Sequence, residues 1–158
     1  MKNNFSSEID GMDRKILNAL QKDGRITNLD LSEMVGLSPT ATSERVKRLT
    51  RDGYIVGYHA ELSPDHLGLG LTVFVEVKLE RTTTDVFEAF ANSTRRFDEI
   101  AECYLVAGGF DYLIKARVKD MNAYRSFLSD VIVQLPGVRE THTYAVIEDV
   151  KTGQSLPV

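Results

Sequence analysis

The residue types best suited to chemistry lie on one short stretch, from Leu37 to Gly53. Ser38 is a favourable helix N-cap, Pro39 suits the first turn, and Gly53 can end a helix. A helix here places an apolar stripe on one side and hydroxyl and basic side chains on the other. Such a surface can enter the DNA major groove and contact phosphates and base edges. The predicted DNA-contacting residues are Ser38, Pro39, Thr40, Ala41, Ser43, Glu44, Arg45, Lys47, Arg48 and Arg51.

These side chains are not expected to act alike. Arg45 lies nearer the flank of the helix, so we expect it to meet a phosphate rather than a base. Glu44 has two open interpretations: it can accept a hydrogen bond from cytosine N4, or pair with Lys47 or Arg48 along the helix. The pair within the helix is slightly favoured. A basic face that is merely solvated is the simpler alternative, and the helices expected before this stretch argue against it.

Three short helices are expected to position the basic stretch. The first follows Asp10, the second begins near Asn28, and Gly36 turns the chain into the third. Two short helices joined by a tight glycine turn are typical of a helix-turn-helix. Residues 54–62 then indicate a short two-stranded ribbon that turns near Gly57.

The second half of the chain changes to strand periodicity. Alternating polar and apolar residues predict strands, and the spacings i, i+3 and i+4 predict helices. The expected order is strand 71–79, helix 85–97, strand 100–107, strand 112–118, helix 121–135 and strand 138–148. This βαββαβ order is ferredoxin-like, so the predicted fold class is α+β, with a helix-turn-helix domain followed by a ferredoxin-like effector and oligomerisation domain. Both helices would cover one sheet face, and the open face predicts a subunit interface in a twofold dimer.

Breakers and composition set the boundaries of the domains. We assign 1–62 to the helix-turn-helix domain with its ribbon, 63–70 to a linker, and 71–158 to the ferredoxin-like domain. With 42% hydrophobic and 27% charged residues, the chain has enough apolar material for a core. Its net charge of −4 is uneven, because residues 1–60 hold nine Lys and Arg against eight Asp and Glu. The local basic patch therefore matters more for DNA than the net charge.

Several classes of protein are disfavoured. The single Cys103 cannot form an internal disulfide and fits a reducing compartment. No apolar run reaches membrane-spanning length and no signal core is evident, so we expect a cytoplasmic protein with no membrane partner. His59, His66 and His142 have no Cys or carboxylate at ligand spacing, so no metal site is expected. No catalytic triad or phosphate-binding motif is present, so we expect neither an enzyme nor a cofactor.

Motifs along the chain, in this order and spacing, are jointly specific. The first half contains Asp13-Arg-Lys-Ile-Leu, Gln21-Lys-Asp-Gly-Arg-Ile, Val35-Gly-Leu-Ser-Pro and Glu44-Arg-Val-Lys-Arg-Leu. The second half contains Leu105-Val-Ala-Gly-Gly-Phe-Asp-Tyr-Leu, Asp120-Met-Asn-Ala-Tyr, Leu135-Pro-Gly-Val and Glu148-Asp-Val-Lys. From Asp10 to Pro157 the chain resembles the leucine-responsive/asparagine-responsive (Lrp/AsnC, feast/famine) family of transcription regulators, and its second half is most similar to the leucine-responsive branch.

The resemblance implies a sequence-specific regulator that binds double-stranded DNA and responds to an amino acid. Leucine is the first expectation, with proline, glutamate and other amino acids open. The resemblance also implies homodimers that assemble into tetramers or octamers, associated with the nucleoid. It places the effector near the loop that contains Gly108 and Gly109. The predicted effector-binding residues are Val106, Ala107, Gly108, Gly109, Phe110, Asp111, Tyr112, Met121, Thr141 and Thr143.

Other interpretations of these residues stay open. Gly108, Gly109 and Asp111 are also ordinary hairpin residues. Met121 can simply pack in a core, and the two threonines can be plain strand residues. Two rival functions are an architectural DNA-binding protein without an effector, and a small-molecule-binding module or enzyme on a ferredoxin-like fold.

Overall fold

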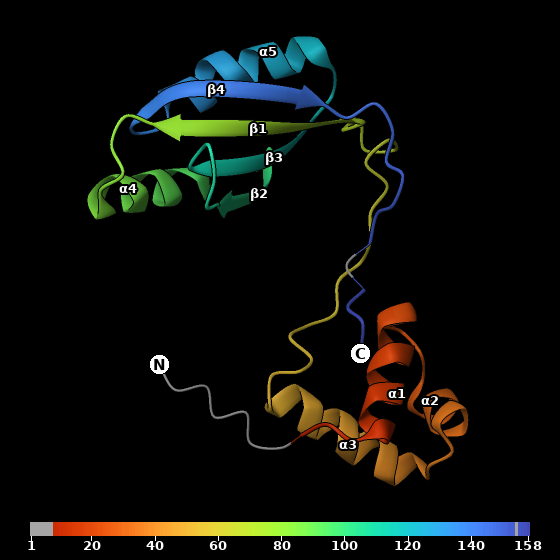
Figure 1. Ribbon diagram of the computed structural model, residues 1–158. Coiled ribbons are helices and arrows are strands. Elements are labelled where there is room, and N and C mark those ends of the chain that lie inside the picture. The colour runs from red at the N-terminus through yellow and green to blue at the C-terminus, as the bar shows by residue number, and fades with distance from the viewer. Residues whose placement is uncertain (1–7, 154) are drawn as a thin grey trace. The chain divides into compact units, whose positions relative to one another are not determined.

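The computed structural model describes residues 8–153 and 155–158, which form two compact units (Figure 1). The helical unit contains the residues up to Glu61 together with Thr152–Val158, and the sheet unit spans Leu62–Lys151. The sequence analysis assigned residues 152–158 to the second domain, whereas in the structure the segment Thr152–Val158 belongs to the helical unit. The other boundaries of that division stay predictions.

Three capped helices build the helical unit. They are α1 (Gly11–Lys22), α2 (Asn28–Val35) and α3 (Pro39–Arg51). The side chains of Asp10, Thr27 and Ser38 each accept a backbone N–H of the first turn that follows, which satisfies donors that a helix leaves free. One small apolar core joins the helices, and its buried members are Ile16, Leu17, Ala19, Leu31, Val35 and Leu49.

The ribbon predicted after α3 is wrong. Residues 54–62 form no strand in the structure. The amides of Tyr54 and Ile55 donate instead to the Leu49 carbonyl, at 2.9 and 3.2 Å, and so extend the end of α3. Val56, which follows, is 93% exposed. A two-stranded ribbon without packing on either face is marginal in water, which explains why alternation alone did not produce one.

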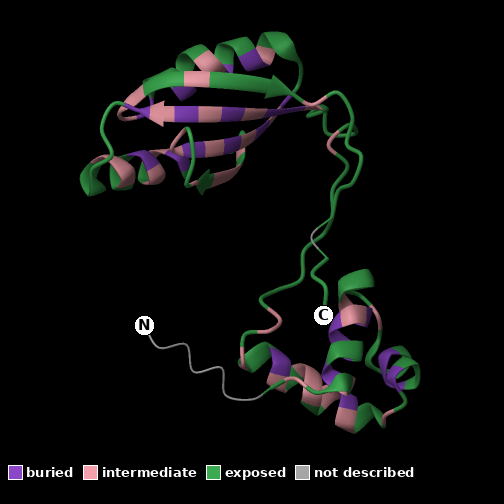
Figure 2. Cartoon of the chain, viewed as in Figure 1, coloured by how far each residue is buried: buried purple, intermediate pink, exposed green. Residues whose placement is uncertain are grey.

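The sheet unit confirms the α+β fold class. Its elements are β1 (Leu71–Leu79), α4 (Thr84–Thr94), β2 (Ile100–Leu105), β3 (Tyr112–Val118), α5 (Met121–Asp130) and β4 (Val138–Ala145). The strands form one antiparallel sheet in the order β2-β3-β1-β4, as the βαββαβ plan requires. Figure 2 shows buried residues on the two central strands, β1 and β3, whereas β4 is mostly exposed.

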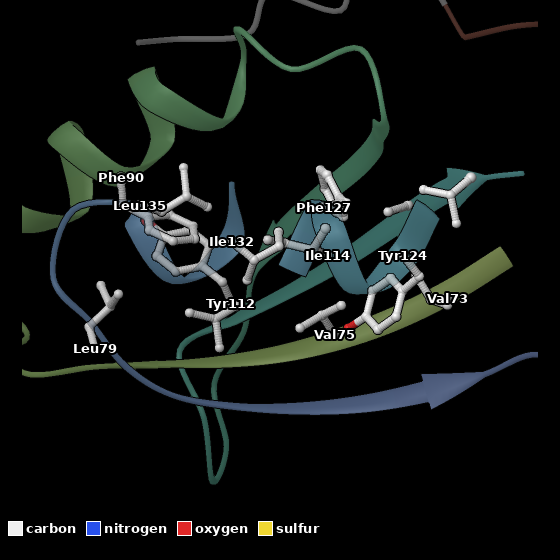
Figure 3. Close-up of a cluster of buried hydrophobic side chains, with 13 residues drawn as sticks. Val73, Val75, Leu79, Phe90, Tyr112, Ile114, Tyr124, Phe127, Ile132 and Leu135 are labelled. Atoms are coloured by element: carbon white, nitrogen blue, oxygen red, sulfur yellow. The ribbon is translucent and has the colours of Figure 1, made fainter. Parts of the chain in front are cut away.

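Both helices of this unit pack on the same face of the sheet. In Figure 3, Phe90 of α4 lies beside Tyr112 of β3 and Leu135, and Phe127 of α5 lies near Ile114 of β3. Phe90 is fully buried and stacks on Tyr112, with the ring centroids 4.3 Å apart. The continuous apolar layer fixes the register of the central strands, because a shift of one residue would turn it to the opposite face.

The helix expected over 121–135 is shorter than predicted. α5 ends at Asp130, and a 3₁₀ turn, η1 (Ile132–Gln134), follows it. Val131 between them has a φ of −117°, outside the helical range. The run Val131-Ile-Val is β-branched, and such side chains crowd the preceding turn of a helix. The helical spacing of apolar residues continues through this run, but the α-helical backbone ends at Asp130.

Candidate DNA interface and effector loop

The turn between α2 and α3 is held by backbone geometry and by one side chain. Gly36 has a φ of +74°, a conformation that glycine adopts without strain. Asn28 Nδ2 donates to the Pro39 carbonyl at 2.8 Å and ties the start of α2 to the start of α3. Ser38 Oγ accepts from the Ala41 amide at 3.2 Å. These contacts determine which side of α3 faces the core.

The opposite side of α3 presents an exposed polar stripe. Thr40, Glu44, Lys47 and Arg51 follow each other at i, i+4, i+7 and i+11, and all four are exposed. The side chains of Lys47 and Arg51 are 70% and 74% exposed. Lys47 Nζ lies 3.3 Å from Glu44 Oε1, which is the pair within the helix that the sequence favoured. The stripe therefore presents a hydroxyl group, a carboxylate and two cations to solvent.

Arg45 and Arg48, predicted to be DNA contacts, point toward α1. Arg48 Nη2 donates to both carboxylate oxygens of Asp13 at 2.6 Å. Arg45 Nη1 donates to Asp13 at 2.9 Å and to Asp10 at 2.7 Å. The Asp13 side chain is only 1% exposed, whereas those of Arg45 and Arg48 are 29% and 36% exposed. We call these four residues the Asp13 cluster.

The Asp13 cluster balances charge inside the helical unit. Two carboxylates face two guanidinium groups, so this flank of α3 adds no net charge. The Asp13 amide, and then the Arg45 guanidinium, lower the pKa of Asp10 to about 2. Hydrogen bonds from Arg45 to Asp10 and then to Asp13 raise the pKa of Arg45. Arg48 Nε is buried with no hydrogen-bond partner among the described residues.

Sequence reasoning missed the cluster, although a signal was present. Asp13 lies three residues before the buried Ile16, on the apolar side of α1. A carboxylate on such a stripe needs a partner, because a lone buried charge is costly. The remaining predicted contacts lie at the start of α3, where Ser38 and Pro39 are exposed and Ala41 and Ser43 are half-buried.

The loop 106–111 joins β2 to β3. The Val106 amide donates to the Asp111 carbonyl at 2.9 Å and closes the loop. The Asp111 amide donates to the Val77 carbonyl at 3.0 Å, and Asp111 Oδ2 accepts from the Leu79 amide at 2.7 Å. Phe110 is half-buried, and the exposed residues between the two ends are Ala107, Gly108 and Gly109. Asp111 therefore anchors an exposed glycine loop to the end of β1.

Two predicted effector residues lie beside this loop. Val77 pairs with Tyr112 on one side and with Thr141 on the other, so the three share one row of the sheet. The Tyr112 ring points into the core, where its hydroxyl donates to the Phe87 carbonyl at 3.3 Å. Burial raises the pKa of Tyr112. Tyr112 directly follows the loop, and its packing in the core therefore holds this end of the loop in place.

The other two predicted effector residues lie farther along the sheet. Thr143 pairs with Val75, two rows farther along the sheet, and its hydroxyl is hydrogen-bonded to the Tyr124 hydroxyl. Met121 is 56% exposed and follows the far end of β3, so the fold of the chain does not bring it to the loop. A cavity of about 390 Å³ at this far end is lined by Arg117, Lys119 and Phe127 among others, and by none of the predicted effector residues.

Within 8–153 and 155–158, no group of three or more His, Cys, Asp or Glu side chains is placed to hold a metal ion. No helix in the part of the chain that the structure describes combines the length and apolarity needed to cross a membrane.

A helix-turn-helix with an exposed basic helix, joined to an α+β domain, defines the class of two-domain DNA-binding regulators. Residues 9–56 match the family described as winged helix-turn-helix DNA-binding, and residues 72–156 match the Lrp/AsnC ligand binding domain. The leucine-responsive regulatory proteins of Klebsiella pneumoniae and Escherichia coli K12 are each 53% identical over 151 residues, covering 96% of this chain and 92% of theirs. The chain belongs to the Lrp/AsnC family. It is a DNA-binding transcriptional regulator that an amino-acid effector modulates.

Two solved structures have a similar fold over nearly the whole chain. A transcriptional regulator from Neisseria meningitidis in complex with L-Met has a TM-score of 0.91 and 39% identity, covering 95% of this chain and 97% of that chain. AsnC from Escherichia coli has a TM-score of 0.87 and 25% identity, covering 96% and 100%.

Proposed function

We propose that the exposed stripe on α3, from Thr40 to Arg51, contacts the major groove of double-stranded DNA operators. The observation that carries this proposal is the stripe itself, whose polar side chains are exposed while Thr42 and Leu49 beneath them are buried. Lys47 and Arg51 are the strongest candidates for phosphate or base contacts, because their side chains stay mostly exposed even though each pairs with a neighbouring carboxylate, Glu44 and Asp52 respectively. Ser38 and the N–H groups at the start of α3 suit a phosphate.

Arg45 and Arg48 have a double role in this proposal. Their bonds to Asp13 hold α3 against α1, and the N–H groups not used by the carboxylates remain for a phosphate. A guanidinium whose orientation is already restrained loses less conformational entropy when DNA binds. The cluster would thus position these two contacts, while Lys47 and Arg51 of the stripe supply exposed cations.

Leucine is the first candidate for the effector. The relatives at 53% identity are leucine-responsive regulatory proteins, and the Neisseria neighbour holds L-Met, which also has an apolar side chain. Amides of the exposed residues Ala107, Gly108 and Gly109 can bind the carboxylate of an amino acid. Met121 and Thr143 lie apart from this loop in one protomer, so a second subunit would complete the pocket.

A twofold dimer that assembles into tetramers or octamers would place copies of α3 at set spacings on DNA. An effector bound at a subunit boundary can favour one assembly over another and so change the affinity for the operator. The protein would act by binding, without catalysis, in the cytoplasm and on the nucleoid.

Operator selection followed by fluorescence anisotropy tests this function. We expect one DNA sequence to bind at least a hundredfold more tightly than a scrambled duplex, and leucine or methionine to shift that affinity. Equal affinity for both duplexes, with no response to any of the twenty amino acids, would favour the architectural alternative.

Asp111→Ala tests the placement of the effector. The variant should lose most of the amino-acid response while its affinity for DNA without effector changes less than about twofold, because Asp111 anchors only the loop. Glu80→Ala, an exposed residue just beyond β1, is the matched control. A wild-type response in the Asp111 variant would refute the placement.

A further inference from the structure

The last residues of the sequence make specific contacts with the first helix. Gln21 Nε2 donates to the Leu156 carbonyl at 3.1 Å, and the Leu156 amide donates to Gln21 Oε1 at 2.6 Å. Asn18 Nδ2 donates to the Val158 carbonyl at 2.9 Å. Figure 1 shows the C-terminal end beside α1. These bonds join residues that are 135 and 140 positions apart.

The hydrogen bonds between α1 and the segment 155–158 resemble those between two paired strands. A glutamine side chain carries one acceptor and two donors, so Gln21 can exchange two bonds with a single residue, as the residues of a hydrogen-bonded antiparallel pair do. Asn18 and Gln21, three apart on a helix, are separated by about 5–6 Å. Leu156 and Val158, two apart in extended chain, are separated by about 6.6 Å. The two spacings match, so one helix face can bind alternate residues of the segment.

Pro157 suits this mode of binding. Proline has no N–H and restricts the residue before it to extended conformations. In an extended segment, alternate residues turn their backbone groups to opposite sides, so Pro157 needs no donor toward α1. Leu156 is 70% exposed, and its hydrogen bonds to Gln21 use backbone atoms only. A segment already biased toward extended chain loses less entropy when it docks.

The docked segment changes how the helical unit is connected. The helical unit contains Thr152–Val158 as well as the residues up to Glu61. The chain therefore passes between the two units twice, once at Glu61–Leu62 and once at Lys151–Thr152. A second connection has an effect only while the segment 155–158 stays bound.

We propose that Asn18 and Gln21 form a binding surface on α1 for the segment 155–158 of the same chain, and that this contact limits reorientation of the DNA-binding unit. The second part rests on the proposed binding of two operator half-sites by a dimer. Two restrained units bind paired half-sites with a higher effective concentration than two loosely connected ones. The affinity for a single half-site does not depend on this restraint, because only one DNA-binding unit takes part.

Amide hydrogen exchange of the full chain tests the docking without DNA. Gln21→Ala should raise exchange across residues 155–158 by about tenfold, because both bonds to Leu156 are lost. Gln21→Glu, which keeps an acceptor but no donor, should have a smaller effect. Lys15→Ala, exposed on the same helix, is the matched control and should change nothing. Unchanged exchange in Gln21→Ala would overturn the docking.

Paired and single half-site duplexes then test the restraint. Gln21→Ala, and a chain that lacks 155–158, should each bind paired half-sites about three- to tenfold more weakly, with single half-site affinity within about twofold of wild type. Adding Gln21→Ala to the shortened chain should have no further effect. Raised exchange with unchanged paired binding would overturn the restraint alone, whereas a wild-type chain that binds no DNA would overturn the proposed function instead.

Discussion

The helical unit and the sheet unit are stabilised by different means. Thirteen buried hydrophobic residues form the core of the sheet unit, whereas six form that of the helical unit, counted over the described residues. The helical unit also buries the Asp13 carboxylate and pairs it with two arginines of α3. Apolar burial is non-directional, whereas charged hydrogen bonds depend on angle and distance. The smaller unit therefore adds directional contacts that hold α3 against α1.

Phe90→Ala in the sheet unit should have the largest effect. The ring is fully buried and stacked on Tyr112, so its removal should cost about 3–5 kcal/mol of unfolding free energy. Urea unfolding with amide exchange can assign the loss to the sheet unit. Exposed Glu88→Ala on the same helix is the control. A loss spread equally over α1 to α3 would show that the two cores are not independent.

Asp13→Asn should weaken the helical unit, with an effect of about 2–4 kcal/mol. The substitution leaves Arg48 without a carboxylate and Arg45 with Asp10 alone, and the partial exposure of both guanidinium groups keeps the loss below that of a fully buried pair. Exchange rates of α1 and α3 would report the change. Exposed Glu33→Gln on α2 should be neutral. A loss below about 0.5 kcal/mol would mean that apolar packing alone holds this unit.

Arg51→Ala and Arg48→Ala should separate DNA contact from structure. Arg51→Ala should lower operator affinity about tenfold, or about 1.4 kcal/mol, without changing the unfolding midpoint. It should also reduce the slope of log affinity against log salt by about 0.9.

Arg48→Ala should lower both the affinity and the stability of the helical unit, because Arg48 donates to Asp13. Lys119→Ala, exposed in the sheet unit, is the control for charge. The distinction between the stripe and the cluster would fail if both arginine variants changed stability alike.

Acid should weaken the helical unit through Asp10, the smallest of these effects. The pKa of Asp10 is lowered from 3.8 to about 2 in the folded chain, so its contribution is complete above pH 3.8 and is lost as the pH falls toward 2. Asp10→Asn keeps a good N-cap but cannot titrate in this range. Acid unfolding of this variant should therefore be less steep between pH 4 and 2, and an unchanged profile would exclude a role for Asp10.

Local signals in the sequence predicted the helices and most strands. The caps at Asp10 and Ser38 and the turn at Gly36 act within a few residues, and period-2 alternation predicted β1 over its full range. Prediction from such local signals failed where a strand needed a pairing partner or where the backbone conformation of a single residue ended a helix. Residues 54–62 have the alternation of a strand but form none in the structure. The helix α5 ends before Val131, although the helical spacing of apolar residues continues beyond it.

By itself, the sequence determined the α+β plan, the exposed stripe of α3 and the glycine loop before β3, because each depends on contacts a few residues apart. Only the tertiary structure decided that Arg45 and Arg48 face Asp13, that Asp111 caps the end of β1, and that Leu156 binds Gln21. Those partners are 32 to 135 residues apart. Periodicity states which face of an element is buried, but the choice of partner depends on how the buried faces pack together.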